Sequence, residues 1–400
     1  MRCFVLGAGV SKSVGYPLGT ELFGEMDKFV KDSGACVDRF DYAREWPELH
    51  RWLETNTNPT IAQAYRTRNI EHIFTALDLA EHLRSDALSG IVHARRDPEM
   101  SRLKSDQFEF YDKVIEEYGR FRSVLLWALE HYFSYRHSKD LEGFRGSDWD
   151  GLRDFADTLS PGDVVVTFNY DATVERVLLS RGKWSPKDGF GFELVFEETY
   201  NGNARVDWGK SSVKVLHLHG ATGWYRRPLF APGYQPAGSG AVPFAVFGAA
   251  PMGTNISLDP EFLKGFGIFT AVDACLPDTL PVANERHVVL HPSFLKDYSS
   301  GEGALTDLWR QAAEALRSAD RVFVVGYSLP GADSAALTLL LTNLRRGVGR
   351  IVNPDGGTKM RLAQLLQTGD GFQGAAYFQD WARSGCPDSV QWTSSKKVAV

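Results

Sequence analysis

Short apolar runs that end in turn residues recur along this chain, and they constrain its fold more than any other feature. Strand-like runs of this kind occupy residues 4–6, 163–167, 213–218, 287–290, 321–325 and 349–352. Helical patterns follow several of them. Strands that are apolar on both faces and alternate with helices are typical of a parallel sheet covered on both sides. The sequence therefore predicts an α/β fold.

The region between the first two runs has a different pattern. It shows no strand pattern, and its apolar residues recur at helical spacing behind a candidate N-cap, Asn69. Two stripes result: Ile70, Ile73, Phe74, Leu77 and Leu83, then Tyr111, Val114, Ile115, Tyr118, Leu125, Leu129 and Tyr132. We therefore predict a Rossmann-like parallel sheet with helices on both faces, formed by residues 1–35 and 150–400. An all-helical insertion, residues 36–149, follows the first strand.

Charge, hydropathy and cysteine content argue against several classes of protein. The formal net charge is −6 and no basic block exceeds Lys396-Lys397, so direct nucleic-acid binding is not indicated. No run approaches the roughly eighteen apolar residues of a membrane span. The cysteines lack the paired spacing of a zinc site or a disulfide framework, which predicts no bound metal and favours the cytoplasm; they are Cys3, Cys36, Cys275 and Cys386.

The first candidate site is the glycine loop in "MRCFVLGAGVSKSVGYPLG". Gly7 and Gly9 permit a tight turn with close backbone approach to a phosphate, and a helix beginning near Ser11 would direct N–H groups toward it. As a dinucleotide fingerprint the loop is imperfect, because Lys12 stands where G-x-G-x-x-G requires its third glycine. Nucleotide binding and an ordinary strand-to-helix turn both stay open on these residues alone.

Two further candidates follow the middle strands. In "VVVTFNYDATVERVL", Asn169 and Asp171 come at the carboxyl end of a strand, where open α/β sheets place ligand-binding groups; the alternative is that one of them caps the next helix. In "VKVLHLHGATGW", His217 and His219 are two residues apart, so we expect them on one face of a strand. No third ligand with suitable spacing favours a metal pair, and His217 is best interpreted as a core histidine.

Two late segments complete the candidate set. "RVFVVGYSLPGADSAAL" carries Gly326 and Ser328 after a buried strand, and "RIVNPDGG" carries Asn353 and Asp355 after another. Each is also ordinary turn chemistry. The Gly- and Pro-rich segment 225–282 has few periodic stretches, and we expect it near the entrance of the site.

Taken in order, these five motifs resemble the sirtuin family, and more closely its bacterial sirtuin-like defence branch. "GAGVSKSVGYP" is similar to the family's G-A-G-x-S-x-x-x-G-x-P, and "TFNYD" to its T-x-N-x-D. "HG" at 219–220 matches the catalytic histidine motif, and "GYSLPGAD" and "VNPD" correspond to late strands that hold the adenosine ribose. The resemblance covers roughly residues 1–22 and 162–355 and leaves the helical insertion unexplained.

Two departures from the family bear on the activity that the resemblance implies. Protein deacetylase sirtuins carry a zinc module with two paired-cysteine motifs, which this chain lacks. They also continue the first loop with Asp-Phe-Arg, whereas Leu18-Gly19-Thr20 follows Pro17 here. Acyl-lysine chemistry therefore loses support. The implied reaction is hydrolysis of NAD⁺ to nicotinamide and ADP-ribose, with NAD⁺ as substrate and water as nucleophile.

The resemblance also implies roles for individual residues. His219 would be the general base toward water or a ribose hydroxyl, and Asn169 would orient the water and the ribose. Asp171 would hold the carboxamide of nicotinamide. The residues implied to bind NAD⁺ are Gly7, Ala8, Gly9, Ser11, Thr167, Gly326, Ser328 and Asn353.

We expect a regulated NADase that acts as the effector of a bacterial anti-phage, abortive-infection system. Because unregulated NAD⁺ loss would kill its host, we expect control by homo-oligomerisation or by a partner such as a DNA-translocating hexameric ATPase or a short Argonaute-type protein. Two other classes stay open. One is an NAD or ADP-ribose sensor without turnover, which the presence of both Asn169 and His219 disfavours; the other is an NAD-dependent protein deacylase or ADP-ribosyltransferase.

Overall fold

The computed structural model divides into two compact units. The sheet unit comprises Met1–Tyr16, Phe133–Leu290 and Asp297–Val400, and the helical unit comprises Pro17–Tyr132 and His291–Lys296. The helical insertion was expected to span residues 36–149. The structure describes residues 1–32, 42–55, 59–79, 119–129, 132–133, 135–136, 139–140, 143–185, 188–192, 210–226, 244–246, 287–289, 304–331, 333–367, 372–373, 377–387 and 390–391.

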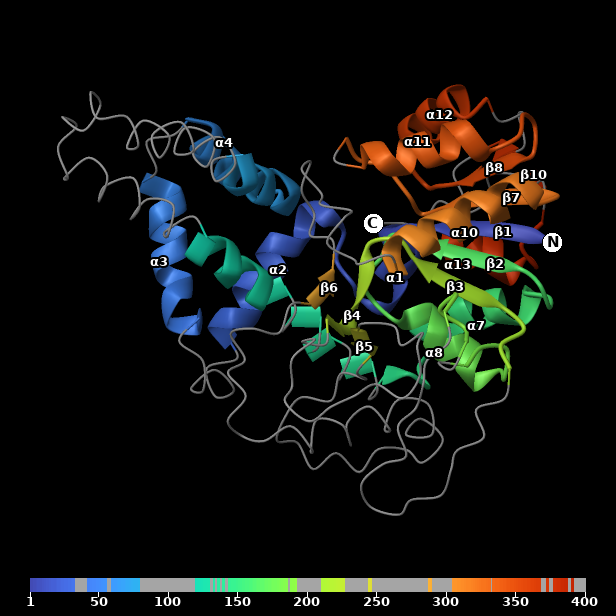
Figure 1. Ribbon diagram of the computed structural model, residues 1–400, viewed down its shortest axis with the longest axis horizontal. Coiled ribbons are helices and arrows are strands. Elements are labelled where there is room, and N and C mark those ends of the chain that lie inside the picture. Colours follow the sequence, from blue (N-terminus) through green and yellow to red (C-terminus); the bar gives the residue numbers. More distant parts are fainter. Residues whose placement is uncertain are drawn as a thin grey trace, which may run out of the picture. The chain divides into compact units, whose positions relative to one another are not determined.

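Five parallel strands form the central sheet of the sheet unit, in the order β3-β2-β1-β7-β8 (Figure 1). Leu6 at the end of β1 lies opposite Thr167 of β2 and Val325 of β7. Residues 3–6 of β1 are buried on both faces of the sheet, which confirms the predicted parallel arrangement. The strands are β1 Arg2–Leu6, β2 Val164–Thr167, β3 Lys214–His217, β7 Arg321–Val325 and β8 Gly349–Val352.

Helices flank this sheet. Phe155 of α7 and Trp381 of α13 pack on Phe4, with ring centroids 5.2 and 6.3 Å apart, so α7 and α13 cover one face together with α8. α10 contacts α11 and β3, and because parallel crossovers are right-handed as a rule, the return of the chain to β7 and β8 predicts α10 and α11 on the other face. The fold is Rossmann-like, as predicted. The helices are α7 Asp150–Thr158, α8 Thr173–Ser180, α10 Ala304–Ser318, α11 Ser334–Asn343, α12 Gly356–Leu365 and α13 Phe378–Arg383.

One predicted strand belongs to a different sheet. Residues 287–290 were expected in the parallel sheet, but β6 (His287–Val289) pairs antiparallel to β4 (Gly220–Arg226), which also pairs with β5 (Phe244–Val246). The chain leaves the parallel sheet after His217 and turns at Gly220, whose φ is +73°, and this gives β6 a separate partner. Most of the segment 225–282, expected near the site entrance, lies outside the described residues.

The remaining elements of the sheet unit are short. The chain leaves β1 through α1 (Ala8–Ser11) and the 3₁₀ turn η1 (Lys12–Val14). A second 3₁₀ turn, η2 (Ser147–Trp149), precedes α7. Near the end of the chain β9 (Phe372–Gln373) and β10 (Val390–Gln391) pair in parallel.

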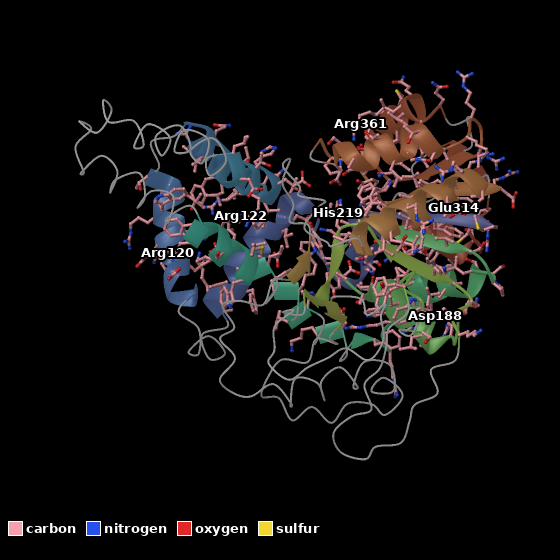
Figure 2. All side chains as sticks on the ribbon, in the orientation of Figure 1. Arg120, Arg122, Asp188, His219, Glu314 and Arg361 are labelled. Atoms are coloured by element: carbon pink, nitrogen blue, oxygen red, sulfur yellow. The ribbon has the colours of Figure 1, made fainter. Side chains whose placement is uncertain are left out.

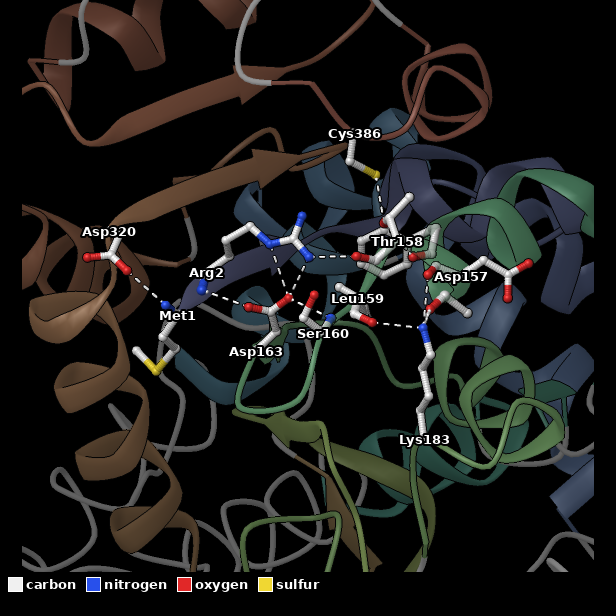
Figure 3. A network of polar contacts seen from close by, with 12 residues as sticks. Met1, Arg2, Asp157, Thr158, Leu159, Ser160, Asp163, Lys183, Asp320 and Cys386 are labelled. Carbon is white, nitrogen blue, oxygen red and sulfur yellow. Dashed lines mark hydrogen bonds and ion pairs between the residues drawn. The ribbon is translucent and has the colours of Figure 1, made fainter.

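A polar network joins the amino ends of β1 and β2 (Figure 3). Asp163 accepts the backbone N–H of Arg2 at 2.8 Å and that of Ser160 at 2.9 Å, and it binds the Arg2 guanidinium at 2.6 Å. The same guanidinium donates to the carbonyl oxygen of Thr158 at the end of α7. Lys183 donates to three further carbonyl oxygens there, those of Ala156, Asp157 and Leu159. The network fixes the sheet edge opposite the candidate site.

The helical unit confirms much of the predicted pattern. Asn69 Oδ1 accepts the Glu71 N–H at 2.9 Å, so Asn69 caps the helix of residues 70–79, in which Ile70, Ile73, Phe74 and Leu77 are buried. In the second stripe Leu125, Leu129 and Tyr132 are buried. Leu83 and the stripe residues from Tyr111 to Tyr118 lie outside the described residues. The other helices are α2 Gly19–Asp32, α3 Tyr42–Thr55, α4 Pro59–Thr67 and residues 119–129.

Interhelical contacts in this unit combine aromatic packing with ion pairs. Phe23, Trp46, His50 and Tyr65 pack ring against ring, and Asp27 accepts the indole N–H of Trp46. Arg120 pairs with Glu45 and Glu48 of α3, and Arg122 binds the buried Asp78 at 2.7 Å (Figure 2). These contacts hold the described helices of the unit against one another.

Candidate functional site

The candidate site lies at the carboxyl edge of the parallel sheet. The chain runs from β1 outward to β2 and β3, then returns to the other side of β1 as β7 and β8. The boundary between β1 and β7 is therefore the point where the strand order reverses, and ligands of open α/β sheets bind in the crevice there. Gly7 follows β1, Asn169 follows β2, His219 follows β3 and Gly326 follows β7.

The glycine loop packs directly on the turn after β7. A Cβ atom on Gly7 would lie 2.5 Å from Tyr327 Cα, and one on Gly9 would lie 2.9 Å from Gly326 Cα. The Gly7 N–H donates to Val325 O at 3.0 Å and the Gly9 N–H to Gly326 O at 2.9 Å. Both glycines are thus required by protein packing, and both of these amides already donate within the protein. Phosphate binding by this loop stays a prediction. Ala8, the first residue of α1, is half-buried.

Asn169, which follows β2, forms hydrogen bonds with the glycine loop that follows β1. Its Nδ2 donates to Gly7 O at 3.1 Å and to Ser11 Oγ at 3.2 Å, while its backbone N–H donates to Thr167 Oγ1 at 3.1 Å. Ser11 is buried, and its hydroxyl is 3.3 Å from Thr173 Oγ1. The structure therefore brings together Asn169, Ser11, Thr167 and the Gly7 loop, four features that the sequence analysis placed in one site.

Asp171 is engaged by the first turn of α8. Its Oδ1 accepts the Thr173 N–H at 3.1 Å and the Thr173 hydroxyl at 2.6 Å. Burial raises the pKa of this carboxyl, and the hydrogen bonds from Thr173 and Ser11 partly oppose that effect. Ala172 is the N-cap of α8, so Asp171 lies one residue before the cap and its carboxylate contacts the first residue of the helix. A role for Asp171 in holding nicotinamide stays a prediction.

His217 is a core histidine, as interpreted from the sequence. Its Nε2 pairs with Glu175 Oε1 of α8, its Nδ1 is 3.1 Å from Asn169 O, and both side chains are 1% exposed. Burial lowers the pKa of His217, but the charge and hydrogen bond of Glu175 outweigh it and raise that pKa above the ordinary value. His217 thus contacts the backbone carbonyl of Asn169 and helps to fix its position.

His219 has different surroundings from His217. The expectation that the two share a strand face is wrong, because β3 ends at His217 and His219 lies in the turn that follows. The imidazole of His219 is 3% exposed, meets the Phe168 ring edge-on at 5.0 Å and lies 6.3 Å from the Tyr170 ring. Its Nε2 is 3.6 Å from Asp333 Oδ1. Figure 2 labels His219 among the side chains.

The two late segments differ in how far they enter the site. Asn353 is buried and its Nδ2 is 3.4 Å from Tyr327 O, so it supports the turn after β7. Gly326 takes a φ of +59° and contacts Gly9. The Ser328 side chain is exposed, and its carbonyl oxygen accepts from Arg361 of α12 (Figure 2). Binding of the adenosine ribose by these residues stays a prediction.

A buried ion pair involves Arg176 in the first half of α8. Arg176 is 1% exposed and pairs with Asp140 at 2.9 Å, and Asp140 also accepts the Tyr16 hydroxyl at 2.6 Å. Burial raises the pKa of Asp140 to about 6, against the opposing effects of Arg176 and the Tyr16 hydrogen bond. This arrangement joins the end of the glycine loop to α8, the helix that also carries Thr173 and Glu175.

Three residues of the site were missed by sequence reasoning. Asp333 and Tyr327 lie within the quoted segment "GYSLPGAD" but were not singled out, and Glu175 lies within "TFNYDATVERVL". Only Asp333 had a usable signal, since an aspartate at the start of a helix after a strand can face either the helix or the cleft. Tyr327 and Glu175 have no signal of their own, because their roles depend on partners from other strands.

Comparisons with known proteins add no relative. No protein-family model matches the chain, and no curated protein matches it. Among the residues that the structure describes, no group of three or more His, Cys, Asp or Glu side chains is arranged to hold a metal ion. Within the same residues, no helix has the length and apolarity needed to cross a membrane.

Proposed function

We propose that the sheet unit is an NAD⁺ hydrolase that releases nicotinamide and ADP-ribose. The observation that carries the proposal is a pair of hydrogen bonds: Asn169 Nδ2 donates to Gly7 O and to Ser11 Oγ. These residues lie at the carboxyl edge of the sheet, near the reversal of strand order. His219 lies at the same edge and contacts the Phe168 ring. A buried imidazole and a carboxamide beside such a loop supply a base and an orienting group for a nucleotide ribose. The sirtuin resemblance of the motifs supports the same reaction.

In this reaction water attacks C1′ of the ribose as the bond to the nicotinamide nitrogen breaks. The bonding electron pair leaves with nicotinamide, which neutralises the pyridinium nitrogen. His219 takes the proton of the attacking water and returns it to solvent, so the products are nicotinamide, ADP-ribose and one proton. Asn169 orients the ribose and the water, and its own amide is held by Gly7 O and Ser11 Oγ.

The cellular role that we propose is that of an anti-phage effector in the cytoplasm. NAD⁺ hydrolysis without control would deplete the host, so the activity is controlled through self-association or through a partner. A DNA-translocating hexameric ATPase and a short Argonaute-type protein are the partner classes implied by the resemblance. This role is supported by the motif resemblance together with the proposed hydrolysis of NAD⁺.

The test is chromatography of nicotinamide and ADP-ribose after incubation of the purified protein with NAD⁺, alone and with the product of the neighbouring gene. We expect both products with wild type and a loss of about 10²-fold or more in His219→Ala and Asn169→Ala. His72→Ala is the matched control, since His72 is exposed in the helical unit. NAD⁺ binding without turnover in every mixture would overturn the hydrolase in favour of the sensor, and turnover that needs an acylated peptide would favour the deacylase.

A further inference from the structure

The carboxylate of Asp333 is unusual for its position. Asp333 is the N-cap residue of α11, where an aspartate side chain ordinarily accepts an N–H of the first turn. Here it makes no side-chain cap hydrogen bond with α11. Oδ2 instead accepts the Tyr327 hydroxyl at 2.7 Å, and Oδ1 is 3.6 Å from His219 Nε2. The side chain therefore faces the site rather than its own helix.

The partners of Asp333 hold it in a defined orientation. Tyr327 stacks on Phe168 with ring centroids 4.7 Å apart and an interplanar angle of 10°, and Phe168 in turn meets the His219 ring edge-on. Asp333, Tyr327 and Phe168 are each less than 7% exposed. With Oδ2 fixed by the tyrosine hydroxyl, the other carboxylate oxygen is directed at His219 in a site that excludes most water.

We propose that Asp333 is the positioning residue of His219. It orients the imidazole through Nε2 and stabilises the imidazolium that forms when His219 accepts a proton, as a carboxylate beside a general-base histidine does. The present separation exceeds a hydrogen bond, and such contacts shorten when a substrate is bound. The Tyr327 hydroxyl orients the carboxylate of Asp333 by donating to Oδ2.

Among the described residues that contact His219, the others do not duplicate this role. Phe168 and Tyr170 present rings, and the indole of Trp309 donates to Leu218 O, in the turn that carries His219. The carboxylate of Glu175 is paired with His217. Removing the charge of Asp333 therefore changes the electrostatic surroundings of His219 while leaving its packing in place.

The inference rests on the proposed function only in naming His219 as a base, so its first test needs no NAD⁺. The pH titration of the His219 imidazole is followed by NMR in the full-length chain, with the signal assigned from its loss in His219→Gln. We expect Asp333→Asn to move the titration to lower pH, because the imidazolium loses an adjacent negative charge. Tyr327→Phe is expected to move it in the same direction by less, because the carboxylate remains but is no longer held.

Glu314→Gln is the matched control, since it removes a carboxylate from the exposed surface of α10 (Figure 2). An unchanged His219 titration in both Asp333→Asn and Tyr327→Phe would overturn the inference. Were Asp333→Asn to fail to fold, the titration of Tyr327→Phe would decide alone, with a downward shift supporting the inference and no shift refuting it.

A second test separates this inference from the proposed function. In NAD⁺ hydrolysis we expect Asp333→Asn to lower kcat by about 10- to 100-fold with KM little changed, and to move the acid limb of the pH profile to lower pH. A shifted titration in a protein that never hydrolyses NAD⁺ would refute the hydrolase and leave the positioning role intact. Full hydrolysis with an unmoved profile in Asp333→Asn would refute the positioning role alone.

Discussion

Gly9 donates its backbone N–H to the carbonyl oxygen of Gly326 at 2.9 Å, and a Cβ atom on Gly9 would lie only 2.9 Å from Gly326 Cα. The two turns thus touch backbone to backbone, one after β1 and one after β7. Gly326 also takes a φ of +59°, a conformation that glycine adopts without strain. Neither position has room for a side chain.

We expect Gly9→Ala and Gly326→Ala each to destabilise the sheet unit by about 2 kcal/mol or more, because the added methyl group must separate the two turns. Urea unfolding monitored by tryptophan fluorescence measures the change. Gly24→Ala in α2 is the control: nothing lies within 4 Å of its Cβ position, and alanine is the better helix former by about 0.5–1 kcal/mol. A neutral Gly9→Ala would contradict the close packing of the turns.

The Asp163 network offers a second test at the opposite edge of the sheet. Asp163 is 3% exposed and accepts from Arg2 and from the Ser160 N–H, so Asp163→Ala leaves several donors without their acceptor. We expect a loss of about 3 kcal/mol in the free energy of unfolding. Asp163→Asn, which retains one side-chain oxygen, is expected to lose less. Equal losses in the two variants would show that the acceptor oxygens are not what stabilises this edge.

The buried His217–Glu175 pair predicts a pH dependence of stability. Because Glu175 raises the pKa of His217 in the folded protein, the folded state holds the proton more tightly than the unfolded chain. The stabilisation is therefore fully present below the unfolded value of about 6.5 and is lost as the pH rises through the folded pKa. Urea unfolding between pH 6 and pH 9 is expected to show this decline.

Glu175→Gln tests whether the charge of Glu175 causes this pH dependence of stability. It removes the charge that raises the pKa of His217, so we expect lower stability at pH 6, by about 3 kcal/mol, and a flatter profile above it. The surface variant Glu314→Gln is expected to retain the wild-type slope. A slope unchanged by Glu175→Gln would assign the pH dependence to other groups.

Asn69 provides a test in the helical unit. Its Oδ1 caps the helix of residues 70–79 through the Glu71 N–H, and Asn69→Ala is expected to cost about 1 kcal/mol. Asn69→Asp keeps the acceptor oxygen and is expected to remain close to wild type. The free energies of unfolding of the three proteins provide the comparison, and an alanine variant as stable as wild type would exclude a stabilising cap.

Local patterns were enough to predict much of the fold. The sequence 4–6 is apolar at every position, as a strand buried on both faces requires, and the buried β1 confirms this prediction. The stripe at Ile70, Ile73, Phe74 and Leu77 likewise matched a buried helix face. The strand at 287–290 was found but assigned to the wrong sheet, because an apolar run does not reveal its pairing partner. Pairing depends on the path of β4 after Gly220.

The candidate site was predictable in its residue types but not in its pairings. Asn169 and the glycine loop come together because both follow neighbouring parallel strands, a relation that strand order implies. The contact of His219 with Asp333 depends on an N-cap side chain that turns away from its helix, and no local pattern shows such a turn. The contacts of Asp171 with the N–H and hydroxyl of Thr173 likewise have no local pattern that predicts them.

The central position of β1 has a consequence for biosynthesis. β1 is made first, yet its two neighbours are β2, beginning at Val164, and β7, beginning at Arg321. At about 5–20 residues per second, the ribosome needs roughly 15 to 60 seconds after β1 to deliver β7. Until then the turn at Gly7 lacks Val325 and Gly326, on which it is built. A nascent chain therefore cannot hold a finished site, and any activity of that site can begin only after β7 has been made.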